Sequence, residues 1–468
     1  METRRTNSAF SLCLLSLSSL CVFSLSFSPI DNYLVDCGST VDATVDNRLF
    51  VSDLSRVESH LLLASSSRSV QLSDRIYDSA RVFDRPSRYV FNIRDQGTLM
   101  VRLHFRQFNS SKIDFDDAQF HVLVNKYVVL SNFSGGHKMS SPVVKEYLIP
   151  VDTEKLVITF LPAKKSKFAF VNAIEVISAP KDLILDTAQF VNGDKVENFD
   201  GLSKQALEVM YRVNVGGPKV TPFNDTLWRT WVPDDPFFRS IDVSKRVYFG
   251  GRIKYRDGGA SREVGPNNVY GTARVIASTN ASIPNVNMTW DFPVIDGYKY
   301  LIRFHFCDIA SISLGLLYFN VYVNGNLAYK DLDLSFVSGY VLASPFYADF
   351  VVDGDDLGVL SLSVAPSNKS MAYAIDGILN GVEIMKMNKP TGILDGELCE
   401  GLILQSWPRS NTSFLFALIA AVCVLLSLSV FTHKKRNGMK NSVAWSKLPT
   451  DVPEVDSNHG NQQISGNL

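Results

Sequence analysis

The segment LMVRLHF at residues 99–105 has a counterpart, LIRFHF, at residues 301–306. In both, an Arg and a His alternate with apolar residues, which is the period-two pattern of a strand with one face in a core. Arg102 and His104 share one face of the first strand, and Arg303 and His305 share one face of the second. The pair is either two active-site strands or one core strand that occurs twice.

Three further matches favour a duplicated domain. They pair YDSARV (77–82) with YGTARV (270–275), FHVLVN (120–125) with FNVYVN (319–324), and NAIEV (172–176) with NGVEI (380–384). The matches keep the same order and their offset changes slowly, as loop insertions in a repeated unit would produce. No nucleophile or metal ligand recurs with the Arg and His, since Arg106 stands where the second copy has Cys307. We therefore interpret the segments as structural strands.

Short alternating runs separated by Gly, Asn and Asp turns, without a long amphipathic helical pattern, predict an all-β fold. We expect two tandem antiparallel β-sandwiches, at residues 32–178 and 207–386, joined by an ordered connector at residues 179–206. The formal net charge is −1, so the composition gives no reason to expect binding to nucleic acid.

Two apolar segments flank these domains. Residues 1–28 have a signal-peptide pattern, with Arg4 and Arg5 before an apolar run. Residues 413–432 are uncharged and long enough to span a bilayer, and the sequence HKKR follows at once. Because basic residues stay on the cytoplasmic side, we predict a type I, single-pass plasma-membrane protein with its N-terminus outside. Residues 387–412 are then a stalk and residues 433–468 a disordered cytoplasmic tail.

Glycosylation sequons agree with that topology, because all seven lie between the apolar segments. They begin at Asn109, Asn132, Asn224, Asn280, Asn287, Asn368 and Asn411. Outside the apolar segments only Cys37, Cys307 and Cys399 remain, an odd number whose pairing stays open.

The motifs of catalysis are missing from the sequence. It contains no Gly-rich kinase loop with H-R-D and D-F-G, no P-loop and no H-E-x-x-H. The acidic clusters fit turns better than glycosidase carboxylate pairs. We expect no catalytic residue, no cofactor and no metal.

One stretch has the composition of a recognition surface, LWRTWVPDDPFF at residues 227–238. Aromatic side chains near an Arg are favoured at binding sites. The candidate ligand-binding residues are Trp228, Arg229, Trp231, Phe237 and Phe238. Alternatively, this Pro-containing loop plugs the second sandwich.

A series of motifs resembles a known family. DCGST (36–40), ARVF, VRLHF, NFS, VKEYLI, FAFVNAIEVISAP, YRVNVGG, LIRFHFC and ILNGVEIMKMN follow in order over residues 32–388. They resemble the ectodomain of the plant malectin-like receptor kinases of the FERONIA and THESEUS type. AWSKLP (444–449) resembles the juxtamembrane segment of that family, whose kinase domain this chain lacks.

The resemblance implies two malectin-like domains facing the cell wall. It implies as partners a secreted peptide of the rapid-alkalinisation-factor type with a GPI-anchored co-receptor, and pectin or another wall glycan. We therefore predict a kinase-less receptor-like glycoprotein that binds such a ligand as co-receptor, decoy or modulator. The alternative is a truncated form of a receptor serine/threonine kinase.

Overall fold

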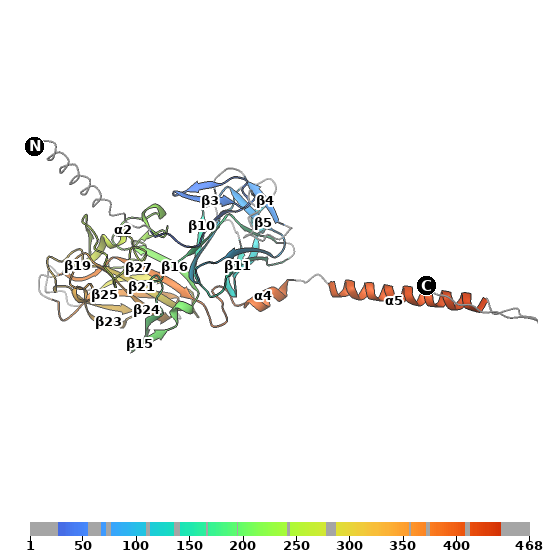
Figure 1. Ribbon diagram of the computed structural model, residues 1–468. Helices are drawn as coiled ribbons and strands as arrows, with labels where there is room; N and C mark the ends of the chain where they lie inside the picture. Colours follow the sequence, from blue (N-terminus) through green and yellow to red (C-terminus); the bar gives the residue numbers. More distant parts are fainter. Residues whose placement is uncertain are drawn as a thin grey trace, which may run out of the picture. The chain divides into compact units, whose positions relative to one another are not determined.

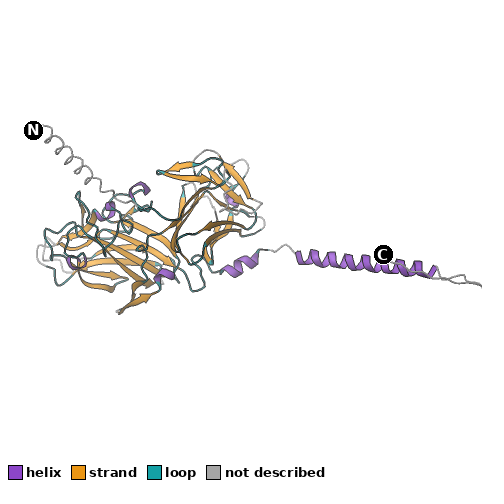
Figure 2. Cartoon of the chain, viewed as in Figure 1, coloured by secondary structure: helices purple, strands orange, loops and turns teal. Residues whose placement is uncertain are grey.

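The computed structural model describes residues 27–54, 67–71, 76–108, 113–134, 141–164, 167–193, 195–240, 244–277, 287–354, 357–370, 375–407 and 412–440. Most of the predicted signal peptide and tail lie outside these residues, as do the sequons at Asn109, Asn280 and Asn411. The chain divides into two compact units, residues 1–407 and 408–468. Strands dominate the first unit, so the all-β prediction is confirmed (Figure 2).

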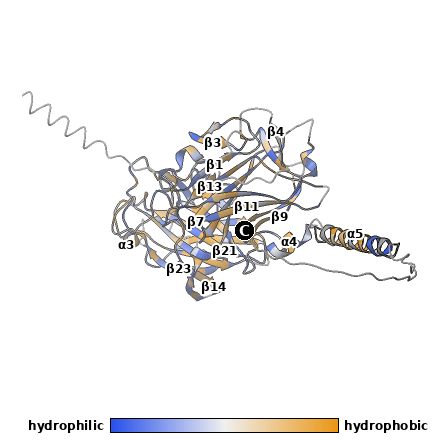
Figure 3. Cartoon of the chain, turned by 45° about the vertical axis from the view of Figure 1, so that its right-hand side comes forward, coloured by the Kyte–Doolittle hydropathy of each residue, from blue (hydrophilic) through white to orange (hydrophobic). Residues whose placement is uncertain are grey.

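The second unit contains one long helix, α5 (Thr412–Lys440). Its segment Ala417–Arg436 is long and apolar enough to cross a membrane. Figure 3 shows hydrophobic colouring over most of α5 and hydrophilic colouring at one end. This agrees with a single membrane-spanning segment.

The first domain is a sandwich of short sheets. One layer has the strand order β10-β7-β13-β1-β3-β2 and faces the sheets β6-β11-β8-β9 and β12-β5-β4. The elements are β1 (Asn32–Asp36), β2 (Ala43–Val45), β3 (Arg48–Ser52), β4 (Ser67–Gln71), β5 (Ser79–Phe83), β6 (Ser87–Asn92), β7 (Gly97–Phe105), η1 (Phe115–Asp117), β8 (Gln119–Val124), β9 (Tyr127–Ser134), β10 (Val143–Val151), β11 (Lys155–Pro162), β12 (Ala169–Val171) and β13 (Ala173–Ser178).

The second domain repeats this arrangement. The layer β24-β21-β27-β16 faces the sheets β20-β25-β22-β23 and β18-β19-β26. The elements are η2 (Leu202–Lys204), β16 (Leu207–Asn214), η3 (Pro222–Asn224), β17 (Val232–Pro233), β18 (Ser244–Tyr248), α2 (Asn267–Tyr270), β19 (Thr272–Ala277), β20 (Met288–Pro293), β21 (Lys299–Cys307), β22 (Tyr318–Val323), β23 (Asn326–Asp333), α3 (Leu334–Val337), β24 (Pro345–Asp353), β25 (Val359–Pro366), β26 (Ile375–Leu379) and β27 (Gly381–Met387).

The two strands with the repeated Arg and His lie at the centre of these layers. Strand β7 contains LMVRLHF and β21 contains LIRFHF. Val101 and Phe105 point into the first core, and Ile302 and Phe306 point into the second. Burying each such side chain contributes roughly 1.5–3 kcal/mol. The alternation in the sequence therefore identified the two core faces.

The two domains share one sheet. Strand β10 of the first domain pairs antiparallel with β16 of the second, with Tyr147 opposite Glu208 and Leu148 opposite Leu207 (Figure 1). A third apolar cluster, which includes Leu148, Leu207 and Met385, lies across this junction. Hydrogen bonds and apolar packing thus both connect the sandwiches.

The two domains are joined head to tail, so that unlike edges of the two sandwiches meet. Since the orders β10-β7-β13-β1 and β24-β21-β27-β16 correspond, β16 is the counterpart of β1 and β10 is the counterpart of β24. The connector continues the pattern, because it forms a hairpin of β14 (Thr187–Asn192) and β15 (Lys195–Asp200). Strand β14 pairs in parallel with β24, the edge that corresponds to β10. Each domain therefore has its β10-type edge covered.

The predicted stalk begins with residues that pack on the first domain. Ile393 bridges to Val128, and the Asp395 carboxylate accepts a hydrogen bond from the Ser131 amide at 2.8 Å. The short helix α4 (Glu400–Ser406) buries Ile403 against Leu123 and neighbouring side chains. Residues 388–407 are therefore part of the same compact unit as the two sandwiches.

Candidate functional site

Three repeated segments meet in each domain as a Tyr–His–Glu triad. In the first domain the Tyr77 hydroxyl lies 2.8 Å from His104 Nδ1, and His104 Nε2 lies 3.0 Å from Glu175. In the second domain Tyr270 lies 3.0 Å from His305 Nδ1, and His305 Nε2 lies 3.2 Å from Glu383. Each residue comes from one of the segments that match between the two halves.

The triads resemble catalytic groups in composition but not in electrostatics. Burial raises the pKa of Tyr77 to about 12, whereas an activated nucleophile needs a lowered pKa. Burial also lowers the pKa of His305, which is fully buried together with Tyr270. Within the triads, buried polar groups thus pair with one another, as structural strands require.

The glutamates of the two triads belong to a row of alternating charges that crosses the shared sheet. In strand order from β24 to β13 and then β3, the row is Asp349, Arg303, Glu383, Arg212, Glu146, Arg102, Glu175 and Arg48. We call this row the charge ladder. Its N–O distances are 2.7 Å (Arg303–Asp349), 2.7 Å (Arg212–Glu383), 2.8 Å (Arg212–Glu146), 2.9 Å (Arg102–Glu146), 2.9 Å (Arg102–Glu175) and 2.6 Å (Arg48–Glu175). Arg303 and Glu383 face each other across β21 and β27.

Glu146 is the member that joins the two domains. It accepts hydrogen bonds from Arg102 in its own domain and from Arg212 in the other. Burial alone would raise its pKa, but the two guanidinium groups lower the pKa to about 2. At neutral pH Glu146 is therefore ionised, with an arginine on each side of it.

The predicted recognition loop covers the ladder. The Leu227 carbonyl accepts a hydrogen bond from Arg102 at 2.8 Å, and the Trp231 ring lies edge-on to His305 at 5.3 Å. Asp225 holds the loop together, because it pairs with Arg229 at 2.9 Å and accepts from the Trp231 indole at 2.9 Å. This part of the loop therefore packs on the sheet face opposite the second core, whereas Phe238 is a member of that core.

The five candidate residues therefore lie in different surroundings. Arg229 and Trp231 are buried, and Phe238 is buried against Trp290 at 5.1 Å. Phe237 is half-buried and stacks on Phe292. Trp228 alone among the five faces a cleft between the domains.

That cleft has a volume of about 480 Å³. Its walls come from the β2–β3 hairpin, β10, β16 and the loop before β17, and ladder residues form its floor. The guanidinium of Arg48 lies between the rings of Phe50 and Trp228, at 5.3 and 5.1 Å from their centroids. Sequence reasoning missed Arg48 and Phe50, because nothing in a single motif links them to a loop about 180 residues later.

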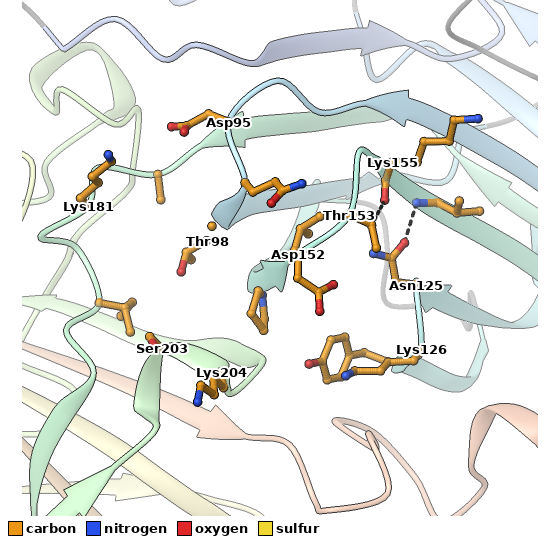
Figure 4. A pocket seen from close by; sticks show the side chains of 18 of the residues that line it. Asp95, Thr98, Asn125, Lys126, Asp152, Thr153, Lys155, Lys181, Ser203 and Lys204 are labelled. Atoms are coloured by element: carbon orange, nitrogen blue, oxygen red, sulfur yellow. Dashed lines mark hydrogen bonds between the residues drawn. The ribbon is translucent and has the colours of Figure 1, made fainter.

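A second concave surface is rich in lysine. Two adjoining hollows of about 960 and 900 Å³ share Lys126, Tyr127 and Lys204, and together form what we call the basic groove. The first hollow is lined by Lys126, Lys155, Lys181 and Lys204, with Asp95 and Asp152 among them (Figure 4). The second hollow adds Lys299 and Lys389, with Asp353 and Glu400. The four lysines of the first hollow are exposed, while Lys299 pairs with Asp353 and Lys389 approaches Glu397 at 3.6 Å. The groove shares no lining residue with the cleft.

The remaining predicted positions are the glycosylation sequons, possible metal ligands and the cysteines. The described sequon residues Asn132, Asn224, Asn287 and Asn368 are exposed. Over the described ranges no group of three His, Cys, Asp or Glu side chains is placed to hold a metal ion. Cys37 and Cys307 are buried as free thiols, and Cys399 is half-exposed.

Fold and surface together define a tandem β-sandwich ectodomain with concave surfaces at the domain junction. The Malectin-like domain matches residues 35–387, and the chain belongs to this family. Receptor-like protein kinase THESEUS 1 of Arabidopsis thaliana is 39% identical over 381 residues, which cover 79% of this chain and 43% of the relative. Receptor-like protein kinase HERK 1 of the same plant is 37% identical over 448 residues, which cover 93% of this chain and 52% of the relative.

These relatives are kinases, but the chain spans only about half their length and aligns with their ectodomains. Among solved structures, the complex of plant peptide RALF23 with FER and LLG2 matches with a TM-score of 0.67 and 31% identity. The match covers 79% of this chain and 99% of that chain. The described residues 27–440 contain the ectodomain fold and one membrane-type helix, and no kinase domain lies among them.

Proposed function

We propose that this protein is a plasma-membrane receptor-like protein whose extracellular tandem binds a secreted peptide. The observation that carries this proposal is the match to an ectodomain that was crystallised with a peptide and a further protein. The peptide is of the rapid-alkalinisation-factor type, and a GPI-anchored co-receptor assists its capture. The protein acts as co-receptor, decoy or modulator through residues 27–407.

Calorimetry on the secreted ectodomain tests this function. Residues 1–407 form a compact unit of their own, which makes this part suitable for purification. We expect a peptide of this type to bind at tens of micromolar or tighter, about 6–7 kcal/mol, and more tightly with the GPI-anchored partner present. Heat signals no larger than those of a scrambled peptide, with and without the partner, would refute it.

Transcript sequencing distinguishes a truncated receptor kinase from a protein that acts without a kinase. If the chain is a truncated receptor kinase, full-length transcripts continue past Leu468 into a Gly-rich kinase loop. If the protein acts without a kinase, the transcripts end at this residue. Protease protection of intact cells tests the topology, because the ectodomain should be digested and the C-terminal segment protected.

A second candidate function is binding of an acidic wall glycan such as pectin, favoured by the basic groove. Ammonium groups along a groove suit a chain that bears a carboxylate on successive sugars, and such attraction weakens as salt increases. We expect binding of oligogalacturonate to the ectodomain to weaken in the double variant Lys126→Ala/Lys204→Ala. The matched control is Lys245→Ala/Lys330→Ala, two exposed lysines outside the groove. Equal binding by both double variants would exclude the groove.

A further inference from the structure

The cleft between the two domains combines a charged floor with an apolar rim. The floor residues Arg102, Glu146 and Glu175 are already paired within the ladder. Around them the apolar side chains of Val144 and Val232 line the cleft and are 44 and 37% exposed. Since the charges are satisfied and apolar surface is open, the site favours a largely neutral, apolar ligand over a polyanion.

Arg48 anchors the wall of the cleft. Its two terminal nitrogens bind Glu175 at 2.6 and 3.0 Å. Its Nε is buried, so this atom is not available to a ligand in the cleft. Because the carboxylate holds the guanidinium in place, Arg48 in turn holds the Trp228 ring that lies 5.1 Å from it.

Trp228 adds an independent sign of function. Its φ of 55° lies in the left-handed region, where a bulky residue is an outlier. Such conformations persist where surrounding contacts impose them, and they gather at binding and active sites. Here the conformation places the indole ring against the Arg48 guanidinium at the cleft wall. The ring therefore forms a fixed apolar surface at the cleft wall.

We propose that the cleft is the peptide-contacting site of the ectodomain. It takes an extended peptide segment whose aliphatic or aromatic side chain packs on Trp228, beside the exposed side chains of Val144 and Val232. This inference rests on the proposed function, since it assigns the peptide a place. Because β3 and β10 belong to one domain and β16 and the Trp228 loop to the other, a bound peptide contacts both sandwiches.

Peptide selection on wild-type ectodomain, followed by titration on variants, tests the assignment. The probes are a phage-displayed library of random linear peptides and the rapid-alkalinisation-factor peptide. Val144→Glu blocks the rim at an exposed position, and Trp228→Ala removes the indole. Ile295→Glu is the matched control, because it puts the same charge at a residue that is 48% exposed and lines neither the cleft nor the basic groove. Thermal unfolding verifies that all variants are folded.

We expect the enriched peptides to bind Val144→Glu and Trp228→Ala at least about tenfold more weakly, about 1.4 kcal/mol, and to bind Ile295→Glu unchanged. Peptides that bind all three variants like wild type, or a library without enrichment, would overturn the assignment. Peptides that bind only after Asn224→Gln would also overturn it, because the cleft would then hold the glycan of its own rim.

The two probes separate this inference from the proposed function. If library peptides bind the cleft but the rapid-alkalinisation-factor peptide does not bind, the proposed function fails and the assignment of the cleft remains. If that peptide binds equally to wild type and Val144→Glu, the function remains and the assignment fails.

Discussion

Replacing Glu146 by Gln should weaken the joint between the two domains. The carboxylate accepts from Arg102 at 2.9 Å and from Arg212 at 2.8 Å, so the change removes both ion pairs of the ladder at the domain boundary. Each arginine keeps one other carboxylate, Glu175 or Glu383, at 2.9 and 2.7 Å. The loss should therefore lie near the lower end of the 3–5 kcal/mol that is typical when one partner of a buried pair is removed.

The pKa of Glu146 gives the same magnitude and a pH dependence. Arg102 and Arg212 outweigh burial and lower the pKa from 4.5 to about 2, a difference of about 3 kcal/mol at roughly 1.4 kcal/mol per unit. Because the folded-state value lies below the unfolded one, this stability is present above about pH 4.5 and disappears as the pH falls towards 2.

Urea unfolding of the ectodomain between about pH 2 and pH 7 tests both statements. We expect Glu146→Gln to lower the free energy of unfolding by about 3 kcal/mol at neutral pH, and the gap from wild type to close by about pH 2. Glu154→Gln, at an exposed position of the same domain, is the control and should change little. A neutral-pH gap below about 1 kcal/mol, or a gap that persists undiminished at about pH 2, would refute the reasoning.

Three further predictions concern buried groups. Burial raises the pKa of Asp36 to about 6, above its unfolded-state value, so the stability of the wild type falls as the pH rises from about 4 to about 6. Asp36→Asn should remove this fall and add up to about 2–3 kcal/mol to the free energy of unfolding at pH 7. Urea unfolding measures this, and an unchanged pH profile would contradict it. Gly216→Ala should destabilise the protein by roughly 2–5 kcal/mol, because φ is +70° and a Cβ would lie 2.3 Å from a carbonyl oxygen. Gly258→Ala, where φ is +80° and the space is open, should destabilise it by only about 1–2 kcal/mol. Equal unfolding midpoints of the two variants would be the contrary result. Alkylation followed by mass spectrometry should label half-exposed Cys399 well before Cys37, whose thiol pKa is raised by burial, and the reverse order would contradict the buried placement.

The repeated segments predicted the fold because they are its central strands. Period-two patterning at residues 99–105 and 301–306 reports directly which side chains enter a core, and this depends only on local geometry. The matches also contained the Tyr, His and Glu of both triads. Their meeting could not be read from the sequence, because residues about 70 positions apart are joined by strand pairing.

The candidate site was less predictable for the same physical reason. The stretch around Trp228 has the composition of a binding loop, yet Arg229 and Trp231 point inward because Asp225 satisfies both. Whether an aromatic side chain is buried or faces a cleft depends on the partner that covers it. Here that partner includes Arg48 from the other domain, and the pairing of β10 with β16 that brings them together has no motif of its own.

A head-to-tail junction also raises the question of where assembly stops. A unit that offers the same kind of edge it has just used can add another copy without limit, and such heterologous contacts lead to fibres rather than closed particles. Here the connector hairpin occupies the edge that a third sandwich would extend. The hairpin at residues 187–200 thus covers the strand edge at which a further copy could pair, and a chain without it would expose that edge to other molecules.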